Sequence, residues 1–435
     1  MLRKCLIAVL VFNLFGCTHK DDPLTSLPDM SAVRANLAFT CMHEASHLPA
    51  LDPQADGLFQ YARFLQNSDG PKDFNDIVRY YRIAAAHGHY KANHNAQLLI
   101  SQGLADSPDA PNETISLATQ LVEQGIPGGY YDIGHYLEIG YGLKQDPEMS
   151  LRYFRKAADL GNPEAQAYVG EILSPHDKAP DIAQQMRQCA VDQGNGEAAG
   201  TLGINLKNRA LEADAVKVFQ KGVESGDAQS ASFLENGFKG PPPSDRLYFV
   251  GLPNDPERTR RYEQIGKFIN DNDGRNPKVP DIDKIVPLPP AKLPPWDGTF
   301  QWAKERAAAV PPQKPSDELI DKLSKEKNLD PATGLPLAGA SSKTSQNGQP
   351  VTVAAKVPLG TVARTGEQCP EDGVWCAKLE ASQSGDAQRR FLKGDTLPSV
   401  VVHEPRKVVL LDRWIGTRQH TAQVEWKLIA YSDQA

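Results

Sequence analysis

The chain has 435 residues and a mass of 47.6 kDa, which predicts about two to four folded units rather than one compact core. Hydrophobic residues make up 40% of the chain and charged residues 23%, and this composition excludes both a disordered chain and a membrane channel. The 47 Lys and Arg residues are outnumbered by 54 Asp and Glu residues, so the net charge is −7. This mild acidity argues against nucleic acid as the main partner, because proteins that bind phosphate backbones normally carry a basic surface.

The N-terminus predicts secretion. A short basic start precedes an unbroken apolar run at residues 5–12, which is too short to span a bilayer and has the layout of a secretory signal. The ending Leu14-Phe15-Gly16-Cys17 resembles a bacterial lipobox, in which the cysteine is acylated and becomes the new N-terminus. We therefore expect residues 1–16 to be removed and Cys17 to carry lipid. Thr18 at the next position resembles lipoproteins sent to the outer membrane. The alternative is an ordinary signal peptide whose apolar region happens to contain a cysteine.

The remaining cysteines are candidates for disulfides, because the compartment beyond the inner membrane is oxidising. Cys369 and Cys376 flank the turn-rich stretch 370–373, so this pair is the predicted bridge. The pairing of Cys41 with Cys189 stays open. A zinc site at Cys369 and Cys376 is disfavoured, because zinc-binding cysteines normally have about two to four residues between them and a second such pair is missing.

Residues 55–240 are predicted to form helical repeats. The run Tyr80 to Gly88 recurs as Tyr153 to Gly161, and weaker copies close at Gly125, Gly194 and Gly226. A period of roughly 30 to 40 residues with helical patterning indicates stacked helix pairs. Each Gly is expected to supply a left-handed turn between two helices.

The clearest unit has Ile133-Gly134, Gly140-Tyr141-Gly142-Leu143 and then Ala157 to Gly161. This unit resembles the SEL-like repeats, relatives of tetratricopeptide repeats that build superhelical solenoids. The predicted fold is therefore mostly α: a helix-turn-helix repeat solenoid, followed by a Pro-rich extended segment and a small C-terminal β domain. Solenoids of this kind are binding surfaces rather than enzymes. Ahead of the repeats, residues 17–54 are predicted to hold the lipid anchor, a tether and a first helix.

Residues 241–349 are predicted to contain one amphipathic helix at 257–268 and a proline-dense segment at 278–298. The prolines forbid a helix or a central strand and favour an extended ribbon. The ribbon is too apolar for a solvated tether, so we expect it to lie on the solenoid surface; a disordered linker is the alternative. Residues 338–350, rich in Ser, Gly, Gln and Asn, are predicted to be the true flexible linker.

Residues 350–435 are predicted to form a small β barrel or sandwich of five or six short strands. Apolar and charged residues alternate from Val424 to Leu428, and residues 400–402 and 408–411 are rich in β-branched side chains. All five Trp residues lie in the last third of the chain, where they are expected to fill the core of a small β domain.

The string His43-Glu44-Ala45-Ser46-His47 matches the H-E-x-x-H pattern, in which two His on one helical face bind zinc and the Glu activates water. Pro49 follows closely, a third ligand is missing downstream, and the surrounding chain is a repeat scaffold. We therefore interpret the string as a polar cluster at a helix terminus. We expect no catalytic residues, no metal and no cofactor.

Taken along its length, the mature chain resembles one family, the SEL-like repeat lipoproteins that serve as immunity partners of type VI secretion lipases, notably phospholipase D-like effectors. Three stretches carry the resemblance: the run at 278–302, Arg364 to Pro370, and Phe391 to Asp395. The resemblance implies a periplasmic, lipid-anchored protein that binds an incoming phospholipase and blocks its active site. An envelope adaptor that holds endogenous proteins is the alternative, and a zinc hydrolase ranks third.

The candidate partner surface is the concave side of the best repeat together with the ribbon. Tyr and Trp side chains dominate many protein interfaces, so the candidate residues are Tyr130, Tyr131, His135, Tyr141, Trp296 and Trp302. The alternative is that the tyrosines pack between repeats and the tryptophans fill contacts within the ribbon.

Overall fold

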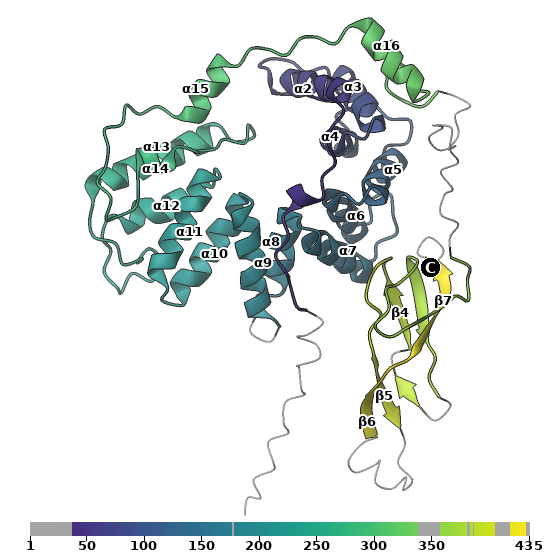
Figure 1. Ribbon diagram of the computed structural model, residues 1–435. Helices are drawn as coiled ribbons and strands as arrows, with labels where there is room; N and C mark the ends of the chain where they lie inside the picture. The colour runs from purple at the N-terminus through teal and green to yellow at the C-terminus, as the bar shows by residue number, and fades with distance from the viewer. Residues whose placement is uncertain are drawn as a thin grey trace, which may run out of the picture. The chain divides into compact units, whose positions relative to one another are not determined.

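The computed structural model describes residues 37–175, 178–337, 357–380, 383–385, 387–404 and 418–431 (Figure 1). The predicted signal peptide with Cys17, the predicted linker at 338–350 and the β-rich run at 408–411 all lie outside the described residues. In the part that is described, no helix is both long enough and apolar enough to cross a membrane.

Paired antiparallel helices form the repeat array, and each helix packs against the next in chain order. The array consists of α2 (Pro53–Asn67), α3 (Phe74–Ala86), α4 (Tyr90–Ser101), α5 (Ala110–Glu123), α6 (Pro127–Ile139), α7 (Pro147–Asp159), α8 (Pro163–Ile172), α9 (Pro180–Asp192), α10 (Gly196–Asn208), α11 (Glu212–Glu224) and α12 (Ala228–Gly237). The predicted helical solenoid is confirmed.

Local sequence signals set the ends of these helices. Asp or Asn side chains cap most helix starts by accepting a backbone N–H of the first turn, as Asp52, Asp146 and Asn195 do. The predicted left-handed glycines are also confirmed, since all of them have positive φ: Gly88, Gly125, Gly161, Gly194 and Gly226. The repeat period in the sequence is therefore the spacing of these turns.

The array curves, with α4, α6 and α8 on its inner side and α5 and α7 on its outer side (Figure 1). After it come α13 (Pro256–Asp271), α14 (Ile282–Ile285), α15 (Gln301–Ala308) and α16 (Asp317–Glu326). The predicted amphipathic helix at 257–268 corresponds to α13. Residues 301–337, which we name the C-terminal clamp, return to the start of the array.

The C-terminal clamp is anchored by apolar and polar contacts with α2 to α4. Ile320, Leu323 and Leu329 are buried in the same core cluster as the first repeat helices. The Arg82 guanidinium donates to the Thr333 carbonyl at 3.1 Å and forms a two-point ion pair with Glu113 at 2.6 and 2.9 Å. The two ends of the array are thereby fixed to each other.

The Pro-rich ribbon lies on the array, as predicted. Val279, Ile282, Ile285 and Val286 are almost fully buried in a core shared with α10 to α13, and Trp296 packs against the edge of that core. Burial of this apolar surface explains why a proline-dense segment is ordered. The expectation that its prolines forbid a helix is wrong over one turn, because residues 282–285 contain no proline and form α14.

The C-terminal domain contains two antiparallel sheets among the described residues, with strand orders β1-β7-β2-β4 and β3-β5-β6. The strands are β1 (Val362–Arg364), β2 (Gly373–Ala377), β3 (Ser384–Gly385), β4 (Gln388–Phe391), β5 (Val400–Glu404), β6 (Arg418–Ala422) and β7 (Glu425–Tyr431). Side chains from both sheets share one core, in which Trp375 and Trp426 are fully buried. The predicted β domain and the predicted role of these two tryptophans are confirmed.

The predicted Cys369–Cys376 disulfide is wrong. Cys369 is buried in the β-domain core together with Trp375, and burial raises the pKa of its thiol to about 12. Cys376 follows Trp375 along β2, so its side chain points to the opposite face of the sheet. The turn at 370–373 does bring the chain back, but it delivers the two thiols to different environments, and both cysteines are free.

Candidate protein-binding surface

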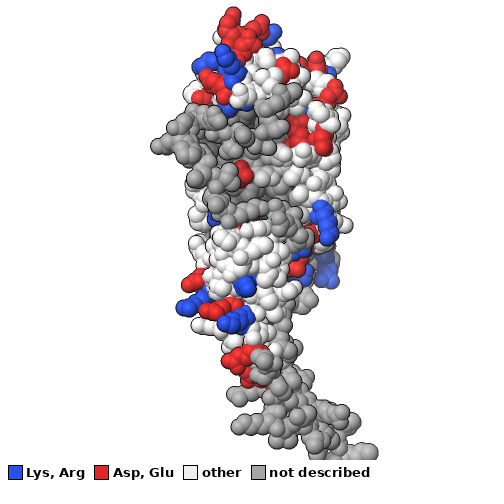
Figure 2. Space-filling view, turned by 90° about the vertical axis from the view of Figure 1, so that its right-hand side faces the viewer, with Lys and Arg blue, Asp and Glu red and all other residues white. Residues whose placement is uncertain are grey.

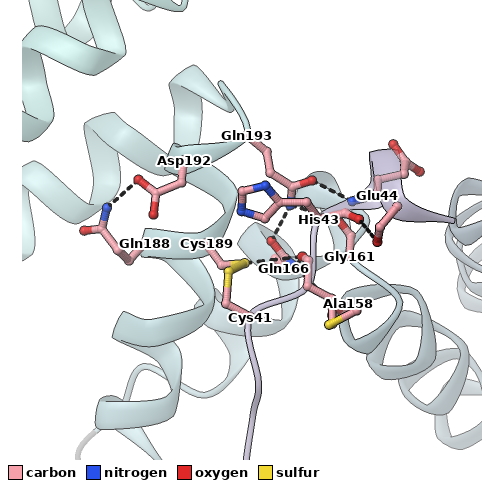
Figure 3. The surroundings of a disulfide bond; sticks show 12 residues. Cys41, His43, Glu44, Ala158, Gly161, Gln166, Gln188, Cys189, Asp192 and Gln193 are labelled. Atoms are coloured by element: carbon pink, nitrogen blue, oxygen red, sulfur yellow. Dashed lines mark hydrogen bonds between the residues drawn. A yellow bond between two sulfur atoms is a disulfide. The ribbon is translucent and has the colours of Figure 1, made fainter. Parts of the chain in front are cut away.

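Residues 39–47, which we name the N-terminal strap, are tied to the array by a disulfide. The sulfur of Cys41 is bonded to that of Cys189 on α9, 148 residues away in sequence (Figure 3). Cys41 is exposed, whereas Cys189 is buried. The pairing left open by the sequence therefore connects the segment before the first repeat to the middle of the array.

Hydrogen bonds extend this attachment along the strap. The Met42 carbonyl accepts from the Gln166 amide at 2.9 Å, and the Glu44 backbone N–H donates to Gln193 at 2.8 Å. Gly161 has φ of +101°, and a Cβ there would lie only 2.6 Å from the Glu44 nitrogen. The strap thus follows the turns between α7 and α8 and between α9 and α10, and the glycine is required for its close approach.

The Glu44 carboxylate is held at the starts of two inner helices. It accepts from the Asn162 side chain at 3.1 Å and from the backbone N–H of Gly128. Burial raises the pKa of Glu44 above its ordinary value and the negative charge of Glu164 adds to this, although the Asn162 hydrogen bond opposes the rise. Helix N-termini favour a carboxylate at this position.

The H-E-x-x-H string does not form the α-helix that zinc binding by two His in successive turns requires. Residues Glu44–Ser46 make a single 3-10 turn, η1, with His43 and His47 as its caps. Within residues 37–52, the described part ahead of α2, this turn is what the structure shows in place of the predicted first helix. Cys41, His43 and Cys189 do lie within 4.8 Å of one another. Their two sulfurs are bonded to each other, which leaves the imidazole as the one unmodified ligand of that group.

The structure does not gather the sequence-predicted interface residues into one cluster. Tyr130 and Tyr131 pack beside Tyr153 and Phe154, and Tyr141 packs on Tyr136 in a different apolar cluster. These tyrosines are half-buried between repeats, which agrees with the alternative stated for them.

The other three candidates are also separated. His135 is exposed on α6 and lies 3.5 Å from the Glu138 carboxylate. Trp296 donates its indole N–H to the Thr299 carbonyl at 2.9 Å, and Trp302 packs edge-on against Phe268. Both tryptophans are half-buried within the contacts of the ribbon and the adjoining clamp.

A different group of residues shares one face of the array. A cavity of about 190 Å³ lies between α6, α8 and α10, and its lining includes Tyr131, Tyr168, Glu164, Glu171, Glu197 and Arg187. The three glutamates are exposed. Tyr131 is therefore the sequence-predicted residue that does lie at a surface cavity.

The electrostatics of this face are acidic. Burial raises the pKa of Tyr131, and the charges of Glu164, Asp132, Glu197 and Glu138 raise it further. The Tyr168 hydroxyl donates a short hydrogen bond to Glu138. Tyrosine rings from α6 and α8 and carboxylates from α8 and α10 thus surround the cavity, and we name the exposed surfaces of α6, α8 and α10 the inner acidic face.

The side of the molecule shown in Figure 2 and the outer helix α7 carry charges of both signs. On the side shown in Figure 2, acidic and basic side chains are interspersed. The outer helix α7 likewise carries ion pairs between Arg152 and Glu148 and between Arg155 and Asp159. The carboxylate excess is not confined to the inner helices, because the outer helix α5 also contains two Glu and no Lys or Arg, although Glu113 on α5 pairs with Arg82.

A second, larger cavity of about 770 Å³ lies between α3 and the clamp. Its two arginines already have partners, since Arg79 pairs with Asp76 at 2.6 Å and Arg82 with Glu113. The cavity therefore marks the seam where the clamp closes on the array.

Two features of the site were not found from the sequence: the Cys41–Cys189 bond and the inner acidic face. The disulfide joins the strap before the first repeat to α9, 148 residues later, so spacing along the chain contains no signal for it. The face did leave a signal, because α6 and α8 contain no Lys or Arg at all. This lack of Lys and Arg indicates an acidic face only when the structure shows that α6 and α8 lie on the same side of the array.

Residues 55–89 and 127–162 match the Sel1 repeat family, and residues 230–337 match a domain of unknown function, DUF6396. Among solved structures, Pseudomonas aeruginosa 5086 (PA5086) and the immunity protein Pa5087 from the same organism are each 29% identical to this chain. Each of these two matches has a TM-score of 0.47 and covers 58% of this chain and 95% of the other. The P. aeruginosa immunity protein PA5088 is 26% identical, with a TM-score of 0.48, and the match covers 58% of this chain and 94% of that one.

No curated protein matches the chain. The two Sel1 stretches coincide with the helix pairs α2–α3 and α6–α7, and the helices between and after them continue the same stacking. The helical array therefore contains Sel1-like repeats.

Proposed function

We propose that the protein is a periplasmic, lipid-anchored immunity protein that binds a type VI secretion phospholipase effector and occludes its active site without catalysis. The observation that carries the proposal is the inner acidic face, where Tyr131, Tyr168 and exposed carboxylates surround a cavity on a Sel1-like array. Repeat arrays typically use such extended surfaces to bind other proteins.

Preorganisation supports this role. The disulfide fixes the strap to α9, and helix α16 of the clamp packs against the first repeat helices. A binding surface held in one conformation loses little entropy on association, so more of the contact energy becomes affinity. Tight stoichiometric inhibition needs such a surface and needs no reacting groups.

The sequence supports the location and the partner. The signal-like start and Cys17 support a location on the periplasmic side of a membrane, where an incoming lipase would act. The segment at 278–302 resembles immunity lipoproteins of phospholipase effectors. Immunity is also the role named for Pa5087 and PA5088 of P. aeruginosa.

The inhibition can be tested with residues 18–435 and each type VI phospholipase of the producing strain. Lipase activity should fall linearly as the protein is added and should vanish at one fixed molar ratio. Suppression of a large excess of lipase would indicate catalysis and would contradict the proposal. If every lipase remains fully active while the protein co-purifies with envelope proteins, the adaptor alternative is favoured.

The anchor has its own test. Cys17→Ser should abolish lipid attachment and remove the mature protein from the outer-membrane fraction. Soluble residues 18–435, which lack this position, should still inhibit the lipase. Unaltered membrane fractionation of this variant would contradict the lipid-anchor part of the proposal.

A further inference from the structure

We propose that the inner acidic face binds a basic segment of the partner protein, with one Lys or Arg side chain entering the cavity between α6, α8 and α10. The identity of the partner rests on the proposed function, whereas the chemistry of the segment rests on the charges and rings described here.

The helices that form the face are depleted of cations. Lys207, in the last turn of α10, is the single Lys or Arg of α6, α8 and α10, and its amine donates to the Arg246 carbonyl at 2.7 Å. The exposed His135 of α6 lies 3.5 Å from the Glu138 carboxylate. The same helices expose Glu164, Glu171 and Glu197 around the cavity. A surface with this charge favours a cationic partner over an acidic or neutral one.

Cations from neighbouring elements compensate these carboxylates only in part. Arg187 interacts electrostatically with Glu171, and Lys278 with Glu164, which leaves three glutamates against two cations. Arg187 on α9 lines the cavity, but it is buried, donates to the Ser174 hydroxyl at 3.1 Å and is outnumbered by the three glutamates. Lys278 on the ribbon is directed to the Ser225 carbonyl at 2.6 Å. The face thus keeps an excess of negative charge.

The size of the cavity selects the kind of occupant. Its volume of about 190 Å³ is below the roughly 300–1,000 Å³ of typical small-molecule sites. It is suited to one long side chain supplied by a larger partner. Tyr131 and Tyr168 contribute aromatic rings to the lining, and such rings attract a guanidinium or ammonium group through their faces.

Because the glutamates are exposed to solvent, the affinity for a basic segment should depend strongly on salt concentration. Attraction between exposed charges is screened within about 10 Å at 0.1 M salt, so association should weaken as salt is raised. The charges would mainly speed the encounter and select the partner, and the buried ring contacts would hold the inserted side chain.

The test uses soluble residues 18–435 and an oligo-arginine peptide as a defined basic segment. Binding is measured by calorimetry at low and high salt. Simultaneous Glu164→Gln, Glu171→Gln and Glu197→Gln substitutions should weaken binding about tenfold at low salt. A matched control replaces exposed carboxylates of outer helices, Glu123→Gln, Glu148→Gln and Asp214→Asn, and it should stay within about twofold of the parent.

Equal weakening by the two triple variants, or none by either, would overturn the inference, because binding would then follow net charge or another surface. Glu164→Gln alone gives the same comparison if the triple variant folds poorly.

A second experiment repeats the binding measurement with a phospholipase that the inhibition assay identifies. If no phospholipase binds but the glutamate substitutions still weaken peptide binding, the proposed function is wrong, and the inference that the inner acidic face binds basic segments is supported. If the phospholipase binds both triple variants as tightly as the parent protein, the inner acidic face is not its binding site, and the proposed function is still supported.

Discussion

The Cys41 sulfur is bonded to the Cys189 sulfur, so the segment before the first repeat is covalently fixed to α9. Most contacts in a repeat array are between neighbouring repeats, and such arrays gain stability chiefly from nearest-neighbour interfaces. This bond and the clamp both connect parts of the array that are far apart in sequence. The disulfide and the clamp therefore restrain the array by contacts beyond those between neighbouring repeats.

Removing the bond should lower stability. Cys41→Ala with Cys189→Ala should reduce the free energy of unfolding by about 2 to 4 kcal/mol, because the closed loop is long and its restraint on the unfolded chain is lost. Guanidinium unfolding of soluble residues 18–435 measures the change. Cys376→Ala, which removes a free thiol on β2, is the control and should leave the unfolding midpoint of the array nearly unchanged. An unchanged midpoint in the double variant would show that the bond contributes nothing.

The close approach of the strap depends on one glycine. Gly161→Ala places a Cβ against the backbone of His43 and Glu44 at 2.6 Å, and it should cost about 3 kcal/mol and release the strap. Gly125→Ala is the matched control, because its φ is also positive but nothing lies within 4 Å of the added Cβ. That control should cost only about 1 kcal/mol. Hydrogen exchange of residues 39–47 should rise in the first variant alone, and equal effects of the two would contradict the packing described here.

Glu44 should make the strap sensitive to pH. Its pKa is raised in the folded protein above the ordinary 4.5, so the folded state binds more protons than the unfolded state in the interval between the two values. The stability contributed by this proton is fully present below 4.5 and is lost as the pH rises through the folded value. Glu44→Gln should remove that loss and flatten the decline in stability as the pH rises above 4.5.

Thermal unfolding across this pH range measures the effect of Glu44. Glu148→Gln, which changes an exposed glutamate on α7, is the control and should leave the pH profile parallel to that of the parent. A Glu44→Gln profile that also runs parallel to the parent would mean that Glu44 titrates normally. Inhibition of the phospholipase should be unaffected by either change.

The clamp should depend on Arg82. This side chain is buried, with Glu113, the Asp106 carbonyl and the Thr333 carbonyl as its acceptors. Arg82→Ala should cost about 3 kcal/mol, because Glu113 and the clamp carbonyl lose their donor. Increased hydrogen exchange at residues 329–337 is the specific readout. Lys217→Ala, which breaks an exposed pair with Asp214, should cost less than about 0.5 kcal/mol, and a similar loss from both variants would contradict the role of Arg82.

The repeat array could be predicted from the sequence because its signals are local. Helix caps, proline starts and the glycines at 88, 125, 161, 194 and 226 each act within one turn of the chain. The burial of the ribbon was also predictable, since apolar residues such as Ile285 have no reason to recur in a solvated tether. Alternation along β7 likewise identified the strand that buries Trp426.

The contacts that define the site could not be predicted in this way, because they join distant segments. Cys369 and Cys376 are close in sequence yet lie on opposite sides of β2, whereas Cys41 meets Cys189 only through the curvature of the array. The aromatic residues chosen for the interface face the repeats rather than one another, with Tyr131 at the edge of the acidic cavity. The sequence identifies residue types that are common at interfaces. Whether such a side chain points to solvent or packs between repeats depends on how its helix is oriented in the array, which the sequence alone does not give.

The most direct test of the central claim is hydrogen exchange of residues 18–435, free and with a saturating amount of the phospholipase that the inhibition assay identifies. The account predicts that complex formation slows exchange in α6, α8 and α10, while the outer helices α5 and α7 exchange as in the free protein. Slowing confined to the outer helices or to the strands of the β domain would contradict the claim that the inner acidic face binds the partner.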